Sequence, residues 1–207
     1  MAKTMTPLEQ GITDGQIHKA AEAYQAMLVK HRHELPSSDA VQKTLGSDAY
    51  LGEQLGVLRK HVERASRMVV RRVTVDRSRT PEELVEATGR RQFVDRDVLA
   101  SMPRRATEGV EEVEFFFFNE GRFLSPDEQE RVLAEYGLEP DYEAQFQVNI
   151  DDPAFADTHP NGMQWRDGKN RPCYADFLRV WDGERGVDVY RSDDDWHAYW
   201  WFAGRRK

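Results

Sequence analysis

Residues 110–121, with the sequence VEEVEFFFFNEG, place four consecutive phenylalanines after three glutamates. Side chains alternate between the two faces of a strand, so Phe115 and Phe117 are expected on one face, opposite to the other two phenylalanines. A strand that is apolar on both faces is usually covered on both, by helices or by a second layer. The stretch therefore predicts a central strand in a layered fold; the alternative is an exposed aromatic patch that docks a partner.

The first third of the chain carries helix signals. The stretches TPLE (6–9) and TDGQ (13–16) both match the capping box, a hydroxyl residue followed three positions later by Glu or Gln. Two apolar stripes recur at helical spacing: Ile17, Ala20, Ala21, Tyr24, Met27 and Leu28, and then Leu51, Leu55, Leu58, Val62, Ala65 and Val69. Because neither stripe should stay exposed to water, we expect an antiparallel helical hairpin or small bundle. It would be closed by residues 39–45 or by a partner chain, for example in a homodimer through the Leu51–Val69 seam.

From residue 70 the hydrophobic period changes from that of a helix to that of a strand. β-Branched residues dominate residues 70–76, which predicts a strand. Further helices are expected after Thr80 and after Ser125, because each is a capping residue followed by proline at the first helical position. In residues 163–207 the turn-like segments DGKN, DGERG and SDDD separate four strand-like stretches, as in an antiparallel meander.

These patterns together predict an α+β fold. Residues 1–69 are expected to form an N-terminal helical hairpin or small bundle. Residues 70–207 are expected to form a mixed α/β region followed by a C-terminal antiparallel β-meander. The two regions are interpreted either as two domains or as one continuous domain.

The composition narrows the class of protein. Hydrophobic residues make up 39% of the chain and charged residues 32%, a balance typical of globular proteins rather than disordered ones. The single cysteine, Cys173, excludes an internal disulfide and a cysteine-rich zinc site, and it fits a reducing cytoplasm. The first residues lack a signal-peptide pattern, and no apolar run approaches the roughly 20 residues needed to cross a bilayer. We therefore expect a cytoplasmic protein without membrane contact, metal or cofactor.

The net charge of −8 is concentrated in one segment. Residues 111–162 contain two arginines and fourteen Asp or Glu residues, which gives a net charge of −12. An acidic surface of this density suits a basic nucleic-acid-binding protein as partner. It would compete with the phosphates of nucleic acid for the basic surface of that partner. The favoured hypothesis is therefore a non-enzymatic binding or regulatory protein that acts through protein contacts. Its candidate partner-binding residues are Glu111, Glu112, Glu128, Glu135, Asp151, Asp152, Tyr199 and Trp201.

The C-terminal stretch DDDWHAYWWFAGRRK supplies the aromatic members of that set. In an extended chain Trp196, Ala198, Trp200 and Phe202 share one face, and His197, Tyr199 and Trp201 share the other. One face is expected to meet the core. The other is either a stacking or docking surface or a further part of a core rich in Trp and Tyr.

An alternative hypothesis is nucleic-acid binding through a basic helix at residues 59–72. Its basic residues Lys60, Arg64, Arg67 and Arg71 are expected on one side, next to the apolar seam, as in a helix that contacts phosphates. Arg205 and Arg206 follow the C-terminal aromatics, and aromatic residues interleaved with basic ones are typical of sites for single-stranded nucleic acid. The helical set also suits an ordinary solvated face.

A third hypothesis is an unrecognised enzyme. The chain lacks the common signatures of nucleotide binding, zinc proteolysis and serine hydrolysis. One remaining candidate is a thiol–imidazole pair of Cys173 with His159 or His197. Another is Asp167 with Lys169, which superficially resembles the acid and lysine of metal-dependent nucleases. Against both, DGKN is typical of a hairpin tip and Cys173 falls within a predicted strand.

The stretches VTVDRSRTPEELVEATGR, DPAFADTHPNG and YWWFAGRRK resemble a group of small bacterial proteins of unknown function. The resemblance covers roughly residues 70–207. It implies a bacterial, cytoplasmic origin and carries no activity or binding residues.

Overall fold

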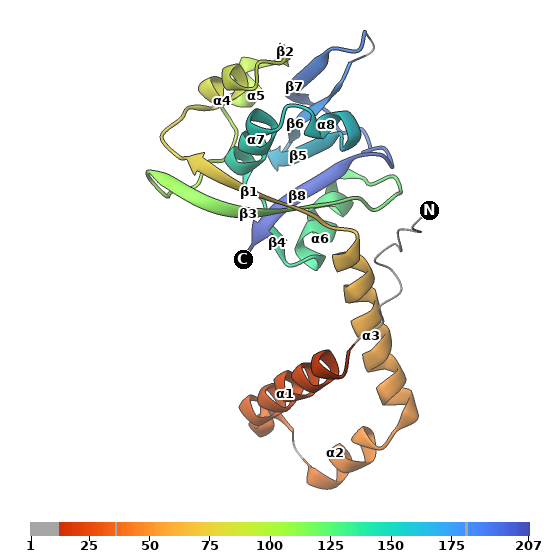
Figure 1. The fold of residues 1–207 in the computed structure, drawn as a ribbon. Coiled ribbons are helices and arrows are strands. Elements are labelled where there is room, and N and C mark those ends of the chain that lie inside the picture. Colours follow the sequence, from red (N-terminus) through yellow and green to blue (C-terminus); the bar gives the residue numbers. More distant parts are fainter. Residues whose placement is uncertain (1–12, 36, 181) are drawn as a thin grey trace, which may run out of the picture. The chain divides into compact units, whose positions relative to one another are not determined.

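The computed structural model describes residues 13–35, 37–180 and 182–207, with the side chain of Arg64 also outside the description (Figure 1). The fold is α+β. The chain divides into two compact units, Met1–Arg59 and Lys60–Lys207, and each is described by itself. None of the helices in the described ranges has the length and apolar character needed to span a bilayer.

The first unit is helical, as predicted. It contains α1 (Asp14–Lys30), a short 3-10 helix (Arg32–Glu34), α2 (Ser38–Leu45) and the first part of α3 (Asp48–Ser66). The capping box predicted at Thr13 is present, since its hydroxyl accepts from the backbone of Gln16 while the Gln16 side chain accepts from the Thr13 N–H. The hydroxyls of Tyr24 and Tyr50 form a hydrogen bond between α1 and α3. However, no residue of α1 or α2 is buried, so the two apolar stripes do not close a core.

The second stripe is shorter than predicted. Helix α3 ends at Ser66, and β1 (Val69–Asp76) begins at the last residue of the proposed Leu51–Val69 seam. Val69 pairs with Phe117 of the neighbouring strand, and Arg71 pairs with Phe115. Strand pairing with the phenylalanine run therefore overrides the helical spacing of residues 65–69, because β-branched residues pack well on a pleated surface.

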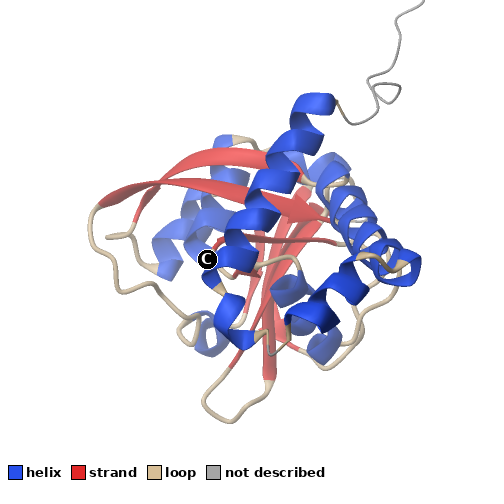
Figure 2. Ribbon diagram, turned by 90° about the horizontal axis from the view of Figure 1, so that it is seen from below, coloured by secondary structure: helices blue, strands red, loops and turns tan. Residues whose placement is uncertain are grey.

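The strands of the second unit form one mixed sheet in the order β1-β3-β8-β5-β6-β7-β2, with β4 paired to β8. The remaining strands are β2 (Arg91–Val94), β3 (Val110–Phe118), β4 (Leu138–Glu139), β5 (Asn161–Arg166), β6 (Pro172–Arg179), β7 (Arg185–Arg191) and β8 (Trp201–Arg206). Figure 2 shows the β1–β3 pair running across the direction of the central strands, as the twist of a sheet requires.

The phenylalanine strand lies inside the sheet, which confirms the sequence prediction. β3 is flanked by β1 and β8, and all four phenylalanines are buried. Phe115 and Phe117 belong to one hydrophobic cluster, and Phe116 and Phe118 belong to another on the opposite face. The strand therefore joins two cores through a single layer of backbone.

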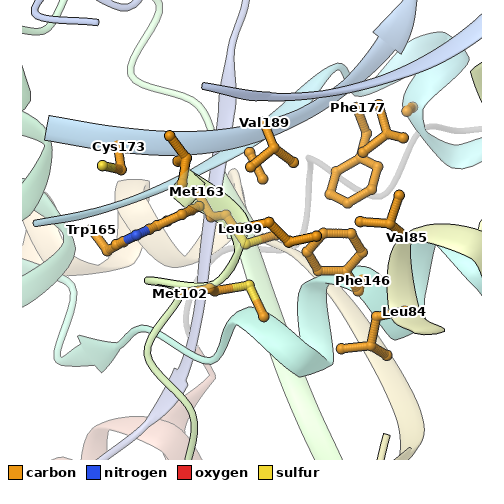
Figure 3. Close-up of a cluster of buried hydrophobic side chains, with 14 residues drawn as sticks. Leu84, Val85, Leu99, Met102, Phe146, Met163, Trp165, Cys173, Phe177 and Val189 are labelled. Carbon is orange, nitrogen blue, oxygen red and sulfur yellow. The ribbon is translucent and has the colours of Figure 1, made fainter. Parts of the chain in front are cut away.

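Helices cover both faces of the sheet. α4 (Pro81–Ala87), α5 (Arg96–Leu99), α7 (Tyr142–Asp151) and α8 (Phe155–Thr158) lie on one face, and α6 (Pro126–Glu135) lies on the other (Figure 1). A third hydrophobic cluster, which we call cluster 1, includes Phe146, Trp165 and Phe177. It fills the space between β5–β7 and the first set of helices (Figure 3). The capping residues predicted at Thr80 and Ser125 open α4 and α6, and each forms a complete capping box.

The predicted C-terminal meander is correct for three strands and wrong for the fourth. β5, β6 and β7 are antiparallel neighbours. β8, however, pairs in parallel with β5 and antiparallel with β3, and β2 adds a parallel edge to β7. The physical reason is that Phe202 enters the core beside Phe118, which a fourth meander strand next to β7 would not allow. Residues 192–200 instead cross one face of the sheet to bring β8 back.

Candidate functional site

A cleft of about 520 Å³ lies on the face of β6 and β7 that points away from cluster 1. Strand alternation separates the two faces, because Ala175 and Phe177 enter cluster 1 while Tyr174 and Asp176 point into the cleft. The returning segment 192–200 forms the other wall. The lining comprises Phe123, Tyr174, Asp176, Leu178, Asp188, Tyr190, Asp194, Asp195, Trp196, His197, Tyr199 and Trp200.

Two aspartates stand opposite each other in the wall of this cleft. Asp176 on β6 and Asp188 on β7 are direct register partners. Asp176 is only 2% exposed, and Oδ1 of each side chain is buried without a hydrogen-bond partner. Burial, and then the charge of Asp188, hold the pKa of Asp176 well above its usual value, and burial also raises the pKa of Asp188. An unsatisfied buried oxygen costs stability, so these two carboxyls need an explanation.

Aromatic rings surround the two aspartates. Tyr174 makes edge contacts with Tyr190 at 4.3 Å between ring centroids and a tilted contact with Trp196 at 5.0 Å. Trp196 also packs edge-on against Trp200 at 5.4 Å. Burial raises the pKa of Tyr174, Tyr190 and Tyr199, so the three phenols stay neutral and keep their hydroxyl protons at physiological pH.

The wall formed by Trp196 is held in place from behind. Its indole N–H donates to Oε1 of Gln164 at 3.0 Å. Its ring lies directly over Gly162, where an added Cβ would sit 2.4 Å from a ring carbon. Only glycine permits this approach, so β5 fixes the position of the ring. The cleft is therefore preformed on this side.

The rim of the cleft adds negative charge. Asp194 accepts a hydrogen bond from the hydroxyl of Ser192, and His197 stacks on Tyr199. No Lys or Arg lines the cleft, and none of the ion pairs among the described residues involves Asp176, Asp188, Asp194 or Asp195. Carboxylates and aromatic faces without an internal cation are suited to a positively charged group.

Several residues proposed as an acidic partner surface are bound to arginine inside the fold. Glu111 accepts from Arg77 at 2.7 Å and from Arg205 at 2.6 Å. Burial would raise the pKa of Glu111, but the hydrogen bonds from Arg205 and Arg77 outweigh it and leave that pKa lowered. Arg77 is fully buried and also binds Asp141 and Glu143, each at 2.7 Å. We call the set Arg77, Arg104, Arg205, Glu111, Asp141 and Glu143 the Arg77 network.

The same pairing extends through most of the acidic segment. Carboxylates of residues 111–162 in ion pairs are Glu111, Glu114, Asp127, Glu128, Glu130, Glu139, Asp141, Glu143 and Asp157. Glu128 also closes the capping box of α6, and the side chain of Asp151 accepts from Gln147. Glu112 and Glu135 are exposed on β3 and α6, and Asp152 ends α7. Much of the net charge of −12 is therefore balanced by arginines elsewhere in the fold.

The two aromatic candidates for partner binding, Tyr199 and Trp201, lie in different surroundings. Tyr199 is 54% exposed and lies in the cleft. Trp201 is half-buried against the core cluster that contains Phe115 and Phe117, with an edge contact to His159 at 4.6 Å. Trp200 and Phe202 face the opposite core cluster. The segment therefore contributes both core and cleft surface.

The basic candidates do not form one stripe. Lys60 and Arg67 are exposed, and the side chain of Arg64 lies outside the described residues. Arg71 is on β1 rather than α3, with its guanidinium 4.6 Å from the ring centroid of Phe155, because the helix ends at Ser66. The remaining basic candidates, Arg205 and Arg206, lie on β8. Arg205 belongs to the Arg77 network, and the guanidinium of Arg206 lies 4.8 Å from the ring centroid of Phe116.

The catalytic candidates lie apart. Cys173 is buried in cluster 1, and burial raises the pKa of its thiol. His159 stacks on Phe155 and hydrogen-bonds Thr158, and burial lowers its pKa. Asp167 sits in the β5–β6 turn, where hydrogen bonds from Arg171, from the backbone and from Arg191 lower its pKa; only the backbone of Lys169 reaches it. Within the described ranges no three His, Cys, Asp or Glu side chains are arranged to hold a metal.

Sequence reasoning missed Asp176 and Asp188. Each aspartate alternates with core residues, within YADFL and VDVYR, so the sequence alone places it on the polar face of an ordinary strand and gives no signal of burial. Their pairing depends on the β6–β7 register, which neither stretch specifies by itself. Comparisons of the chain with protein-family models, curated proteins and solved structures found no match.

Proposed function

We propose that the protein is a non-enzymatic binding protein that acts through protein contacts, and that its binding surface is the cleft between β6, β7 and residues 192–200. One observation carries the proposal: among the described residues, four aspartates without a cationic partner share a cleft with Tyr and Trp rings, and no Lys or Arg lines that cleft. Complementary charge selects a partner with an exposed basic segment. A basic nucleic-acid-binding protein is such a partner.

The cleft replaces the acidic segment 111–162 as the main binding surface in this proposal. Glu111 and Glu128 are held by arginines, so a partner would have to break existing ion pairs to use them. The aspartates of the cleft have no such pairs to lose. Tyr199 remains in the binding set because it is exposed at the cleft.

Binding of a fluorescein-labelled peptide of alternating lysine and alanine, measured by anisotropy, tests the proposal. The double variant Asp188→Asn/Asp195→Asn should weaken binding by about tenfold or more, because two carboxylates leave the cleft. The variant Glu112→Gln/Asp151→Asn removes the same charge outside the cleft and should bind like the wild type. Equal loss in both variants would mean that net charge, rather than the cleft, attracts the peptide.

Nucleic acid is the alternative partner. Lys60 and Arg67 keep exposed side chains, whereas Arg205 and Arg206 are engaged with Glu111 and Phe116. Salt-dependent binding of single-stranded DNA that is lost in Lys60→Glu/Arg67→Glu would favour this alternative over the cleft.

We also propose a homodimer through the part of the seam that lies in α3. Leu51, Leu55, Leu58 and Val62 are each about half exposed and alternate in steps of four and three, the spacing of two helices packed lengthwise. Leu55→Glu/Leu58→Glu should then sediment as a monomer, while Val29→Glu, an exposed apolar position off the seam, should not change the sedimentation coefficient. A wild-type monomer at all concentrations would refute the dimer.

A bacterial, cytoplasmic origin is part of the same proposal. The cytoplasmic part of this proposal is supported by Cys173, the one cysteine of the chain, which is buried as a free thiol.

A further inference from the structure

We infer that the cleft receives a single primary ammonium group, such as the end of a lysine side chain, between Asp176 and Asp188, and that the cation enters in exchange for a proton. The inference rests on the proposed function, because it names the chemical group of the basic partner that the cleft recognises.

The two unsatisfied oxygens are the first step. Oδ1 of Asp176 and Oδ1 of Asp188 are both buried and lack any donor among the described residues. Asp176 lines the cleft and is only 2% exposed. Satisfying a buried acceptor recovers the desolvation cost of leaving it unpaired. A donor that reaches this position would therefore stabilise the pair.

The distribution of these oxygens favours ammonium over guanidinium. The guanidinium of Arg is a flat fork that matches both oxygens of one carboxylate. Here each of two carboxylates, on neighbouring strands, offers one buried oxygen that has no partner among the described residues. An ammonium group has three donors in a compact, tetrahedral arrangement and can reach two separate carboxylates at once. A third donor remains for a phenol oxygen of Tyr174 or Tyr190.

The aromatic walls suit the rest of a lysine side chain. Tyr174, Trp196 and Trp200 form a continuous set of ring contacts behind the aspartates, and Trp196 is fixed by Gln164 and Gly162. Methylene groups pack on such rings, and a cation gains further energy near their faces. Phe123 and Tyr199, each more than half exposed, stand at the cleft where the chain of a partner would leave it.

The charge balance requires the exchange. Burial raises the pKa of both aspartates, and the charge of Asp188 raises that of Asp176 further, so the empty pair retains a proton. When R–NH₃⁺ binds, that proton leaves to solvent and no covalent bond changes. The net charge of the cleft is then the same before and after binding. The affinity for the amine should rise as pH increases through the raised pKa of the aspartate pair. It should fall again at about pH 10.4, where the amine loses its own proton.

Other titratable groups at the cleft do not reverse this direction. Tyr174 and Tyr190 on the strands and Tyr199 on the returning segment have raised pKa values and stay neutral. Asp194, Asp195 and His197 line the rim from the same segment. The strand behind Trp196 presents the neutral Gln164. Asp176 and Asp188 are the carboxyls of the cleft that are held on the strands and have raised pKa values, so the proton exchange is assigned to them.

Calorimetric titration of the full chain near pH 7 tests the inference, using acetylated and amidated tripeptides Ala-Lys-Ala, Ala-Arg-Ala and Ala-norleucine-Ala. The lysine tripeptide should bind at least about tenfold more tightly than the arginine one, and the neutral norleucine tripeptide should not bind. Repeating the titration in buffers of different ionisation enthalpy should show that protons are released when the lysine tripeptide binds.

Variants locate the exchange. Asp188→Asn should weaken binding of the lysine tripeptide by on the order of thirtyfold, since one of two buried partners is lost, whereas proton release from the buried Asp176 should persist. Asp193→Asn is the matched control, because this exposed aspartate is in the same segment but does not line the cleft. Thermal unfolding of both variants confirms that they are folded.

The outcomes separate the two proposals. If the long basic peptide binds through the cleft but the lysine tripeptide binds no better than the arginine one, or releases no proton, the ammonium site is refuted while the proposed function stands. If neither the peptide nor the lysine tripeptide binds, both are refuted.

Discussion

The Arg77 network and the Asp176–Asp188 cleft both bury carboxylates against the same sheet, one with arginine partners and one without. In the network, Glu111, Asp141 and Glu143 surround a fully buried guanidinium. In the cleft, two aspartates face each other among aromatic rings and keep unpaired oxygens. The difference indicates that the net charge of a segment says little about binding, because what matters is whether each carboxylate already has a partner.

Removing the central cation should have the largest effect. Arg77→Leu leaves three carboxylates of the network without their shared partner and should lower the free energy of unfolding by about 3–5 kcal/mol. Urea denaturation measures the loss. Arg206→Leu is the control, since this exposed arginine only stacks on Phe116 and should cost less than about 1 kcal/mol. Similar losses in both variants would show that the network is not a structural element.

Disturbing the contact between Gly162 and Trp196, which supports the cleft wall, should have the next largest effect on stability. Gly162→Ala places a methyl group 2.4 Å from the ring of Trp196 and should cost about 1–3 kcal/mol by overpacking. The displaced ring should also change the tryptophan fluorescence and weaken peptide binding. Gly168→Ala, with no atom within 4 Å of the added carbon, should leave all three unchanged. An unshifted spectrum in Gly162→Ala would mean that the wall is not fixed from behind.

The pH dependence of stability should have opposite signs in the two regions. The raised pKa of Asp176 means that the folded state binds protons more tightly, so its contribution to stability is lost as pH rises from about 4 through that pKa. Asp176→Asn should therefore be about 1–2 kcal/mol more stable than the wild type at neutral pH and converge with it near pH 4. The lowered pKa of Glu111 reverses the sign, because its contribution is present above about pH 4 and is lost as pH falls.

Thermal unfolding between pH 3 and 8 compares the two variants directly. Glu111→Gln should be less stable than the wild type at neutral pH by about 1–2 kcal/mol and converge with it in acid. If both variants change stability in the same direction at neutral pH, the contrast between the two regions is wrong.

The smallest effect is expected at exposed members of the acidic segment. Glu112→Gln should change the free energy of unfolding by less than about 0.5 kcal/mol, because the side chain is exposed on β3. A larger loss would point to a partner for Glu112 that stabilises the fold.

Local sequence signals predicted the elements better than their arrangement. The capping boxes at Thr13, Thr80 and Ser125 and the two-sided phenylalanine strand are written in neighbouring residues, and all four are present. The place of β8 was not predictable in this way, since periodicity specifies the face of a strand and not its neighbour.

The candidate site was less predictable than the fold. Tyr199 was identified from the aromatic C-terminal stretch, but Asp176 and Asp188 come together only through the register of β6 and β7. Conversely, the ion pairs of the Arg77 network join residues 34 to 94 positions apart, so the acids that appeared free in the sequence have partners in the fold. Both outcomes depend on long-range pairing, which composition and spacing do not encode.

The position of β8 also constrains the order in which the chain assembles. It is the last described strand along the chain, yet it lies between β3 and β5 and joins the β1–β3 pair to the β5–β6–β7–β2 group. The two groups therefore have no shared strand to hold them together until Trp201–Arg206 leaves the ribosome. Each presents an open hydrogen-bonding edge during that interval. Synthesis of the strand, rather than collapse of the earlier residues, sets the moment at which the sheet closes.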